Sequence, residues 1–211
     1  MANAITYKDI FLSLPGVLHL KKLVIQENVG NHIVMSLQAI MNAELDDYAF
    51  YDLPETISLN YFQNNQEKIL FKGVISSAVL KKDGGNRIIE IVASDATYWM
   101  DIDRKTRCFQ NIEKTVSEVI AEIMKGYGES DSLCNIPDRP IGELIFQYEE
   151  TDWEFLKRFL SKYNESLYPA ATFETIHFQA GIATQNEDVN WDYYPYQKNK
   201  DFSRLAYLSK N

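Results

Sequence analysis

The sequence predicts an α+β, β-rich protein: an antiparallel β-barrel domain followed by a mixed domain with two helices and a partial second barrel. Three observations support this fold class. Apolar and polar residues alternate through the first half of the chain, two capping-box patterns precede helical apolar stripes after residue 110, and aromatic residues make up 13% of the sequence, which favours strands. We place a soft boundary between residues 100 and 110, which divides the chain into residues 1–105 and residues 106–211.

The predicted barrel begins with a β-hairpin. Residues 23–26 and residues 33–39 place an apolar side chain at every second position. Residues 28–31 (Asn-Val-Gly-Asn) lie between them and tolerate the positive φ of a tight turn. The pattern therefore indicates two antiparallel strands with one apolar face.

Three further strands complete the predicted barrel. Residues 56–61 alternate, residues 69–80 form a long strand, and residues 89–93 return after a turn at residues 83–86 (Asp-Gly-Gly-Asn). Gly73 interrupts the long strand and indicates a bulge or a close backbone approach. Several strands in succession without a helical run between them are typical of a small antiparallel barrel or sandwich.

Two helices are predicted in the second domain, each opened by a capping box. Thr115 and Glu118 open the first helix, Gly128 ends it, and Thr151 and Glu154 open the second helix. The apolar stripes that follow consist of Val116, Val119, Ile120, Ile123, Met124 and Tyr127 in the first helix and of Phe155, Leu156, Phe159, Leu160 and Tyr163 in the second.

Shorter elements are predicted around the two helices. Residues 128–142 are rich in Asp, Ser, Pro and Gly, which is typical of a loop. Residues 144–148, 167–168 and 172–179 are strand-like, whereas the tail from residue 186 onward is polar and aromatic with weak periodicity.

Charge and composition exclude several function classes. The chain has 21 basic and 30 acidic residues, a net charge of −9 and no basic stripe, which counts against nucleic-acid binding. Cys108 and Cys134 are predicted to be unpaired thiols of a reducing compartment. The longest apolar clusters, such as residues 88–93, are far shorter than the ~20 residues that span a bilayer, and no signal peptide is visible. We therefore expect a soluble chain that begins in the cytoplasm.

The motif search predicts no catalytic, cofactor-binding or metal-binding residue. Residues 149–154 contain four carboxylates, which could form an acid–base pair, but a capped helix start prefers such residues, and we interpret them as capping and solvated. Residues 101–103 (Asp-Ile-Asp) lack the Gly and Glu of a calcium loop. Trp99 and Trp153 are interpreted as packing anchors. The chain has three histidines, His19, His32 and His177, and none of them has a second His, Cys or carboxylate at the spacing of a metal site.

One arrangement of motifs is more specific. Residues 71–75 (Phe-Lys-Gly-Val-Ile), residues 107–110 (Arg-Cys-Phe-Gln), the first predicted helix and residues 147–158, which begin Gln-Tyr and end Phe-Leu-Lys-Arg, follow in this order. The order resembles the baseplate hub family of contractile injection systems, which includes the phage late control protein D, the myophage tail hub and the valine–glycine-repeat (VgrG) spike of type VI secretion. The resemblance covers about residues 55–180.

The resemblance implies a structural protein rather than an enzyme. Family hubs are homotrimers in which each chain carries two related barrels, and they adapt the tail tube to the central spike. The implied partners are further copies of the chain, the tail tube protein, and spike and baseplate proteins, with no specific nucleic-acid binding and no membrane insertion. The implied location is a virion tail baseplate or an injection-machine particle, after synthesis in the bacterial cytoplasm. Hubs usually continue past this length, so we expect a fragment whose residues 193–202 re-enter an incomplete second barrel.

Two alternative functions stay open: a peptidoglycan-degrading cell-wall hydrolase, and a carbohydrate- or receptor-binding tail module that uses the tyrosines of residues 193–196. For a hub, the subunit contact is predicted on the long strand around Gly73, because a bulged, long strand is a candidate edge. An interior barrel strand is the alternative. The candidate contact residues are Phe71, Lys72, Gly73, Val74 and Ile75.

Overall fold

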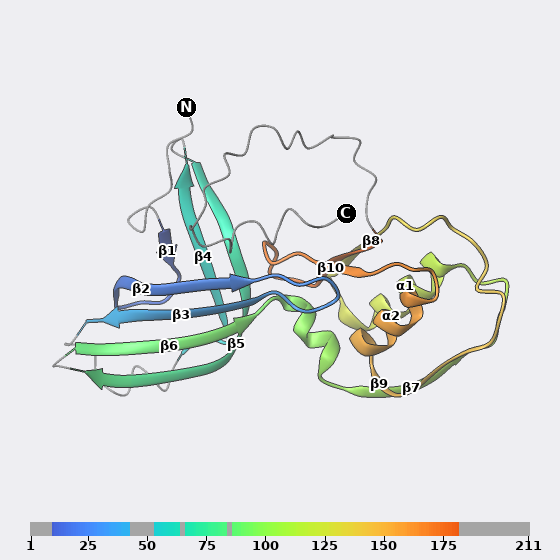
Figure 1. Ribbon diagram of the computed structural model, residues 1–211, viewed down its shortest axis with the longest axis horizontal. Helices are drawn as coiled ribbons and strands as arrows, with labels where there is room; N and C mark the ends of the chain where they lie inside the picture. The colour runs from blue at the N-terminus through green and yellow to red at the C-terminus, as the bar shows by residue number, and fades with distance from the viewer. Residues whose placement is uncertain (1–9, 43–52, 64–65, 84–85, 182–211) are drawn as a thin grey trace, which may run out of the picture.

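The computed structural model describes residues 10–42, 53–63, 66–83 and 86–181. Its first part is one six-stranded antiparallel sheet, in the order β1-β4-β5-β6-β3-β2, that curls into a nearly closed barrel (Figure 1). The strands are β1 (Ile10–Leu12), β2 (Val17–Gln26), β3 (Val34–Met41), β4 (Thr56–Gln63), β5 (Gln66–Asp83) and β6 (Asn86–Ser94).

The long strand β5 belongs to two halves of this sheet. Residues 66–74 pair with β4, and residues 74–83 pair with β6. Figure 1 shows the consequence: β4 and the start of β5 rise steeply beside β2, β3 and β6, which run across the view. A single strand thus turns the corner of the barrel, and its register shifts accommodate the bend.

Alternation along the strands places the barrel core as the sequence predicts. The hairpin of β2 and β3 forms with Leu23 opposite Leu37, and partly buried and buried residues alternate along β3 as far as Ala39. Because successive side chains point to opposite faces of a strand, one apolar face is enclosed. The buried core residues are Ile33, which precedes β3, and, from the strands, Met35, Leu37, Ala39, Ile57, Leu59, Phe71, Ile89, Ile91 and Ala93.

Gly73 is a point of close backbone approach, which confirms one of the two sequence-based alternatives. A Cβ atom at this position would overlap the carbonyl oxygen of Ser94 and would lie 2.7 Å from the ring of Phe71. The bulges lie elsewhere in β5, because the pairing register skips Leu70 on the β4 side and Ser76 on the β6 side. A bulge at Gly73 itself is therefore not observed.

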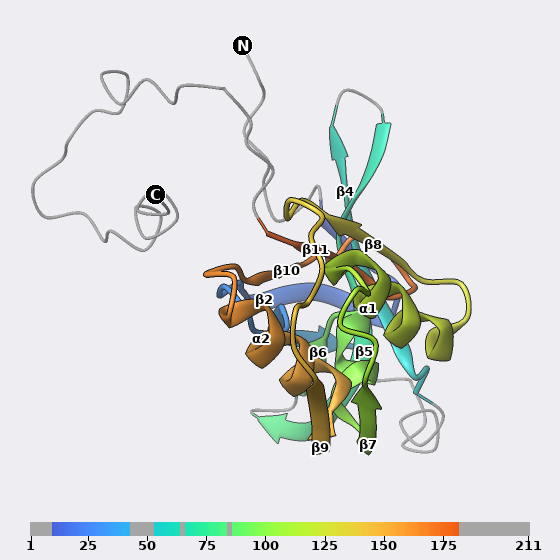
Figure 2. The same ribbon diagram turned by 90° about the vertical axis from the view of Figure 1, so that its right-hand side faces the viewer.

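The second part combines helices with short strands. A two-stranded ribbon pairs β7 with β9, and a second small sheet has the order β10-β11-β8. Figure 2 shows the two helices beside these strands. The elements are η3 (Ala96–Asp101), β7 (Arg104–Phe109), α1 (Val116–Met124), η4 (Lys125–Tyr127), β8 (Asp131–Cys134), β9 (Ile145–Thr151), α2 (Asp152–Ser161), β10 (Leu167–Pro169) and β11 (His177–Ala180).

Both predicted capping boxes are present. The side chain of Thr115 accepts a hydrogen bond from the backbone N–H of Glu118, and Thr151 does the same for Glu154, while each glutamate returns a bond to its threonine. These bonds satisfy backbone donors that a helix start leaves free. Gly128 follows η4 with a positive φ of 63°, a backbone conformation that glycine adopts readily, so the helical segment ends at the predicted glycine.

Two predictions for this part are wrong in detail. Strand β8 lies inside the segment predicted as a loop, and β11 covers residues 177–180, so only residues 177–179 of the predicted strand 172–179 are extended. The two strands pair in parallel over a long separation in sequence, so the local pattern at β8 could not indicate its pairing with β11. The predicted re-entry into a second barrel at residues 193–202 lies outside the described residues.

Buried apolar residues form two separate clusters. One lies within the six-stranded sheet and takes only Ala171 from the second part, and the other lies around α1 and α2. Two cores are what two domains need. Ala96 and Met100, which precede residue 105, belong to the second cluster, and the division at residue 105 stays a prediction. The largest buried side chains of the second cluster are Trp153, Phe155 and Phe159.

Candidate functional site

The five candidate contact residues lie on β5 at the bend of the barrel. The side chain of Phe71 is fully buried, and Gly73 and Val74 are also buried, whereas Lys72 and Ile75 are partly exposed. In strand order β5 lies between β4 and β6 and is not a terminal strand of the sheet. A subunit contact on residues 71–75 stays a prediction, and only Lys72 and Ile75 offer it side-chain surface.

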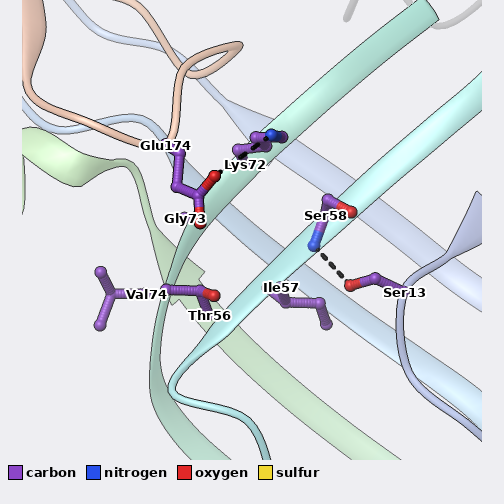
Figure 3. A pocket seen from close by; sticks show the side chains of 8 residues that line it. All are labelled: Ser13, Thr56, Ile57, Ser58, Lys72, Gly73, Val74 and Glu174. Atoms are coloured by element: carbon purple, nitrogen blue, oxygen red, sulfur yellow. Dashed lines mark hydrogen bonds and ion pairs between the residues drawn. The ribbon is translucent and has the colours of Figure 1, made fainter.

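A pocket of about 200 Å³ opens next to this segment (Figure 3). The backbone N–H of Ser58 donates to Ser13 Oγ at 2.8 Å, and Lys72 Nζ lies 3.6 Å from Glu174 Oε2. The pocket thus lies where the barrel meets the loop before β11. Its lining residues are Ser13, Thr56, Ile57, Ser58, Lys72, Gly73, Val74 and Glu174.

The chemistry of this pocket is limited to hydrogen bonding and one ion pair. Glu174 is the single carboxylate of the lining, and its neighbour Lys72 is held by the loop, since the Lys72 backbone N–H also donates to the carbonyl of Ala171 at 2.5 Å. Glycoside hydrolysis requires two carboxylates that face one bond. Among the described lining residues Glu174 is the single carboxylate, and the groups there can form hydrogen bonds and one ion pair.

A cluster of charged and polar groups surrounds Asp152, the first residue of α2. Lys105 Nζ lies 2.7 Å from Asp152 Oδ2, and an Arg107 guanidinium nitrogen lies 3.1 Å from Oδ1. The hydroxyl of Tyr127 donates to Oδ2 at 2.6 Å, and the amide of Gln147 donates to Oδ1 at 2.9 Å. The cluster therefore connects the ribbon of β7 and β9 to α2, which carries Asp152, and to η4, which carries Tyr127.

This cluster corrects one sequence-based interpretation. Asp152 was expected to be a capping or solvated carboxylate, but its side chain is fully buried. Burial by itself raises the pKa of Asp152, yet the hydrogen bonds from Lys105, Tyr127 and Gln147 and the charge of Arg107 lower it below the usual 3.8. Burial and the bond to Asp152 raise the pKa of Tyr127, which keeps the hydroxyl a donor. Both oxygens of Asp152 are engaged, so this carboxylate is a structural anion.

A second buried carboxylate, Asp95, connects β6 to the start of β3. It accepts hydrogen bonds from the backbone N–H of Ile33 and from the backbone N–H of Thr97, the latter at 2.8 Å. Next to it the His32 ring bonds Thr97 Oγ1 at 2.8 Å and lies 4.8 Å from the ring of Trp153. His32 thus fills a structural position between the barrel and α2, in line with its interpretation from sequence.

Metal and membrane features can be judged for the described part of the chain. There, no group of three or more His, Cys, Asp or Glu side chains could hold a metal ion. The Asp101 side chain instead accepts a hydrogen bond from the hydroxyl of Thr151 and lies 3.2 Å from the ring of His32. Among the described helices, none combines the length and apolar character needed to cross a bilayer.

Two exposed surfaces carry features that the sequence did not indicate. Phe62 lies on the hairpin of β4 and β5, and Phe11 lies on β1, which pairs with β4; about half of each side chain is exposed. A groove runs over the outer face of β2, β3 and β6. Strand alternation could have predicted which residues point outward, but not that the hairpin extends beyond the barrel.

These features define a strand-rich module built on a nearly closed antiparallel barrel with a few helices. The chain belongs to the phage tail baseplate hub (GPD) family, whose model matches residues 26–168. The match runs from the end of β2 through α2 and confirms the resemblance drawn from residues 71–75, 107–110 and 147–158. No curated protein sequence matches the chain.

Solved structures share this fold at low sequence identity. The chain is similar to a 43 kDa tail protein of prophage MuSo2 from Shewanella oneidensis (16% identity, TM-score 0.59, 81% of this chain and 52% of that one). It is also similar to a tail protein from Neisseria meningitidis MC58 (16%, 0.57, 80% and 50%). A third is the E. coli c3393 protein, a type VI secretion component similar to T4 bacteriophage tail proteins gp27 and gp5 (16%, 0.56, 80% and 48%). The chain spans about half the length of these proteins.

Proposed function

We propose that this protein is a structural hub, or spike base, of a phage tail or a related contractile injection system, where it adapts the tail tube to the central spike as a homotrimer. The observation that carries the proposal is the hub-family match over residues 26–168, which includes most of the barrel and both helices. The protein works by presenting shaped surfaces, and its partners are further copies of itself, the tube protein, and spike and baseplate proteins.

The charge of the chain supports this role. A net charge of −9 gives each protomer, and any ring built from protomers, an excess of negative charge that disfavours binding of passing nucleic acid. The Asp152 cluster fixes α2 against the ribbon of β7 and β9. The bonds of Asp95 to Ile33 and of Trp153 to Gly30 connect the helical part to the residues before β3, so each protomer presents a fixed face to its neighbours. The assembled particle is the proposed location, after synthesis in the bacterial cytoplasm.

Tube assembly tests the proposal. A tail tube protein, the proposed partner, is polymerised with and without the hub, and nucleation is followed by light scattering. We expect the hub to shorten the lag and electron micrographs to show it at one end of each tube. A hub that leaves the lag unchanged and lies at no tube end would overturn the proposal. So would clearing of purified cell walls that a single acidic substitution, such as Glu174→Gln, abolishes, because that result defines a hydrolase.

A further inference from the structure

The hairpin formed by β4 and the start of β5 is an arm with an apolar outer face. Figure 2 shows this hairpin projecting away from the barrel. Phe11 is 50% exposed, Phe62 47% and Ile69 38%. Residues 66–70 are all exposed, so the body of the protein leaves this end of the arm uncovered.

Strand register puts these side chains on one face. Asn60 lies opposite Phe11 on β1 and opposite Ile69 on β5, and Phe62 follows two residues later on β4. The rings of Phe11 and Phe62 meet edge to face with centroids 5.2 Å apart. Leu59, one position away, points into the barrel core. The outer face of the arm is therefore a compact aromatic ridge, a feature that monomeric surfaces rarely expose without a partner.

A shallow groove of about 320 Å³ crosses the outer face of the barrel over β2, β3 and β6. In its floor the small side chain of Ser36 lies between Val24 and Val92, which are its direct neighbours in register. Val24 and Val92 are both partly exposed. A small residue flanked by two apolar ones leaves room for an inserted side chain. The groove is lined by Lys22, Val24, Gln26, Ser36, Leu37, Gln38, Glu90, Ile91 and Val92.

We propose that the aromatic ridge of one copy docks in the groove of the next copy around the ring. The inference rests on the proposed function, because it names the contact that would build the trimer. Ridge and groove are different surfaces of one chain, and a ring requires such a heterologous contact, whereas a two-fold dimer would pair like with like. Each copy then gives one arm and receives one.

Charge at the rim favours this occupant over an unrelated apolar partner. Glu90 accepts a bond from Gln38 at 3.0 Å and is paired with Lys81 at 2.5 Å. Lys22, at the other rim, has no ion-pair partner among the residues that the structure describes. Glu67 lies directly opposite Phe62 on the arm. When Phe62 of one copy is placed over Ser36 of the next copy, the Glu67 carboxylate of the first copy comes near the rim of the groove. There it supplies the negative charge that complements Lys22 of the next copy.

Cysteine cross-linking tests the contact in the full chain. Cys108 and Cys134 are first replaced by serine, and Phe62→Cys is combined with Val24→Cys. Under mild oxidation or with a short bismaleimide, we expect a ladder of covalent dimers and trimers that stops at three. Either cysteine alone should give no product. The matched control combines Phe62→Cys with Leu18→Cys, an exposed position of β2 outside the groove lining, and should give no ladder.

A second variant measures the contribution of the ridge. Phe62→Ser should weaken trimer association at least tenfold in sedimentation equilibrium, while Val79→Ser, another exposed apolar position on β5, should not. Circular dichroism checks that both variants are folded.

The outcomes separate this inference from the proposed function. Trimers that form without the ladder overturn the arm-in-groove contact and leave the hub intact. If the Phe62→Cys variant forms a cross-link between two copies without a second cysteine, the arms pair with each other, and this result also overturns the arm-in-groove contact. Cross-linking of the arm only to added tube protein assigns the arm to that partner. A chain that neither trimerises nor nucleates tubes overturns the proposed function as well.

Discussion

Lys105 Nζ lies 2.7 Å from Asp152 Oδ2, and the Asp152 side chain is fully buried. Lys105 comes from β7 and Asp152 from the first turn of α2, so the pair joins two elements that are far apart in the sequence. Arg107 and Tyr127 complete the cluster. A buried carboxylate is costly unless it is paired and hydrogen-bonded. The position of α2 relative to the ribbon therefore depends on this cluster.

Replacement of Asp152 by Asn should destabilise the protein. The substitution removes the charge and leaves Lys105 and Arg107 facing a neutral amide. Loss of one partner from a buried ion pair costs about 3–5 kcal/mol, and we expect about 3 kcal/mol because both cations are partly exposed. Urea denaturation measures the change. Glu129→Gln, at an exposed carboxylate, is the control and should change the midpoint little.

The same carboxylate predicts a dependence of stability on pH. The pKa of Asp152 is lowered in the folded protein, because the bonds from Lys105, Tyr127 and Gln147 outweigh the opposing effect of burial. A lowered pKa stabilises the fold above the unfolded pKa of about 3.9, and this contribution is lost as the pH falls through the lower, folded value. The free energy of unfolding should therefore decrease between pH 5 and pH 2. In Asp152→Asn this decrease should be smaller, and an unchanged slope would contradict the assignment.

Gly73→Ala should destabilise the barrel. The new methyl group would overlap the Ser94 carbonyl oxygen and approach the Phe71 ring to 2.7 Å, and such overpacking typically costs about 1–3 kcal/mol. Gly126→Ala is the matched control, because nothing lies within 4 Å of its Cβ position. There we expect a neutral effect or a gain of about 0.4–1 kcal/mol. Equal thermal midpoints for the two variants would contradict the close approach at Gly73.

Trp153→Phe should loosen the contact between the barrel and α2. The Trp153 indole N–H donates to the carbonyl of Gly30 at 3.2 Å, and the ring lies against His32. A phenyl ring keeps part of the packing but leaves that buried carbonyl unpaired, at a cost of about 1–3 kcal/mol. Denaturation followed by circular dichroism measures the loss. Trp99→Phe alters a side chain that is 42% exposed, and a comparable loss there would show that the Gly30 bond has no special weight.

Local patterns were enough to predict five of the six barrel strands and both helix starts, whereas the short strand β1 was not predicted. Apolar and polar residues alternate over residues 33–39 because one face of the strand packs against the core. The capping boxes at Thr115 and Thr151 form hydrogen bonds with backbone groups of their own helix start. Such features need no information from distant residues. The barrel and the helix boundaries therefore followed from the sequence with few errors.

The features that were missed depend on distant partners. Strand β8 exists because it pairs in parallel with β11, and the burial of Asp152 depends on Lys105, Arg107 and Tyr127 from other elements. The acidic run at residues 149–154 indicated a helix start correctly, but nothing local distinguished Asp152 from its exposed neighbour Glu149. The projection of the arm depends on how β5 divides its pairing between β4 and β6.

The solution mass of the protein tests the central claim most directly, namely that this chain acts by assembling copies of itself into a ring. Light scattering coupled to size-exclusion chromatography should give three times the 24.4 kDa of one chain, with the trimer fraction rising as the protein concentration increases. A mass of one protomer at every concentration, including those at which the tube protein assembles, would contradict the claim.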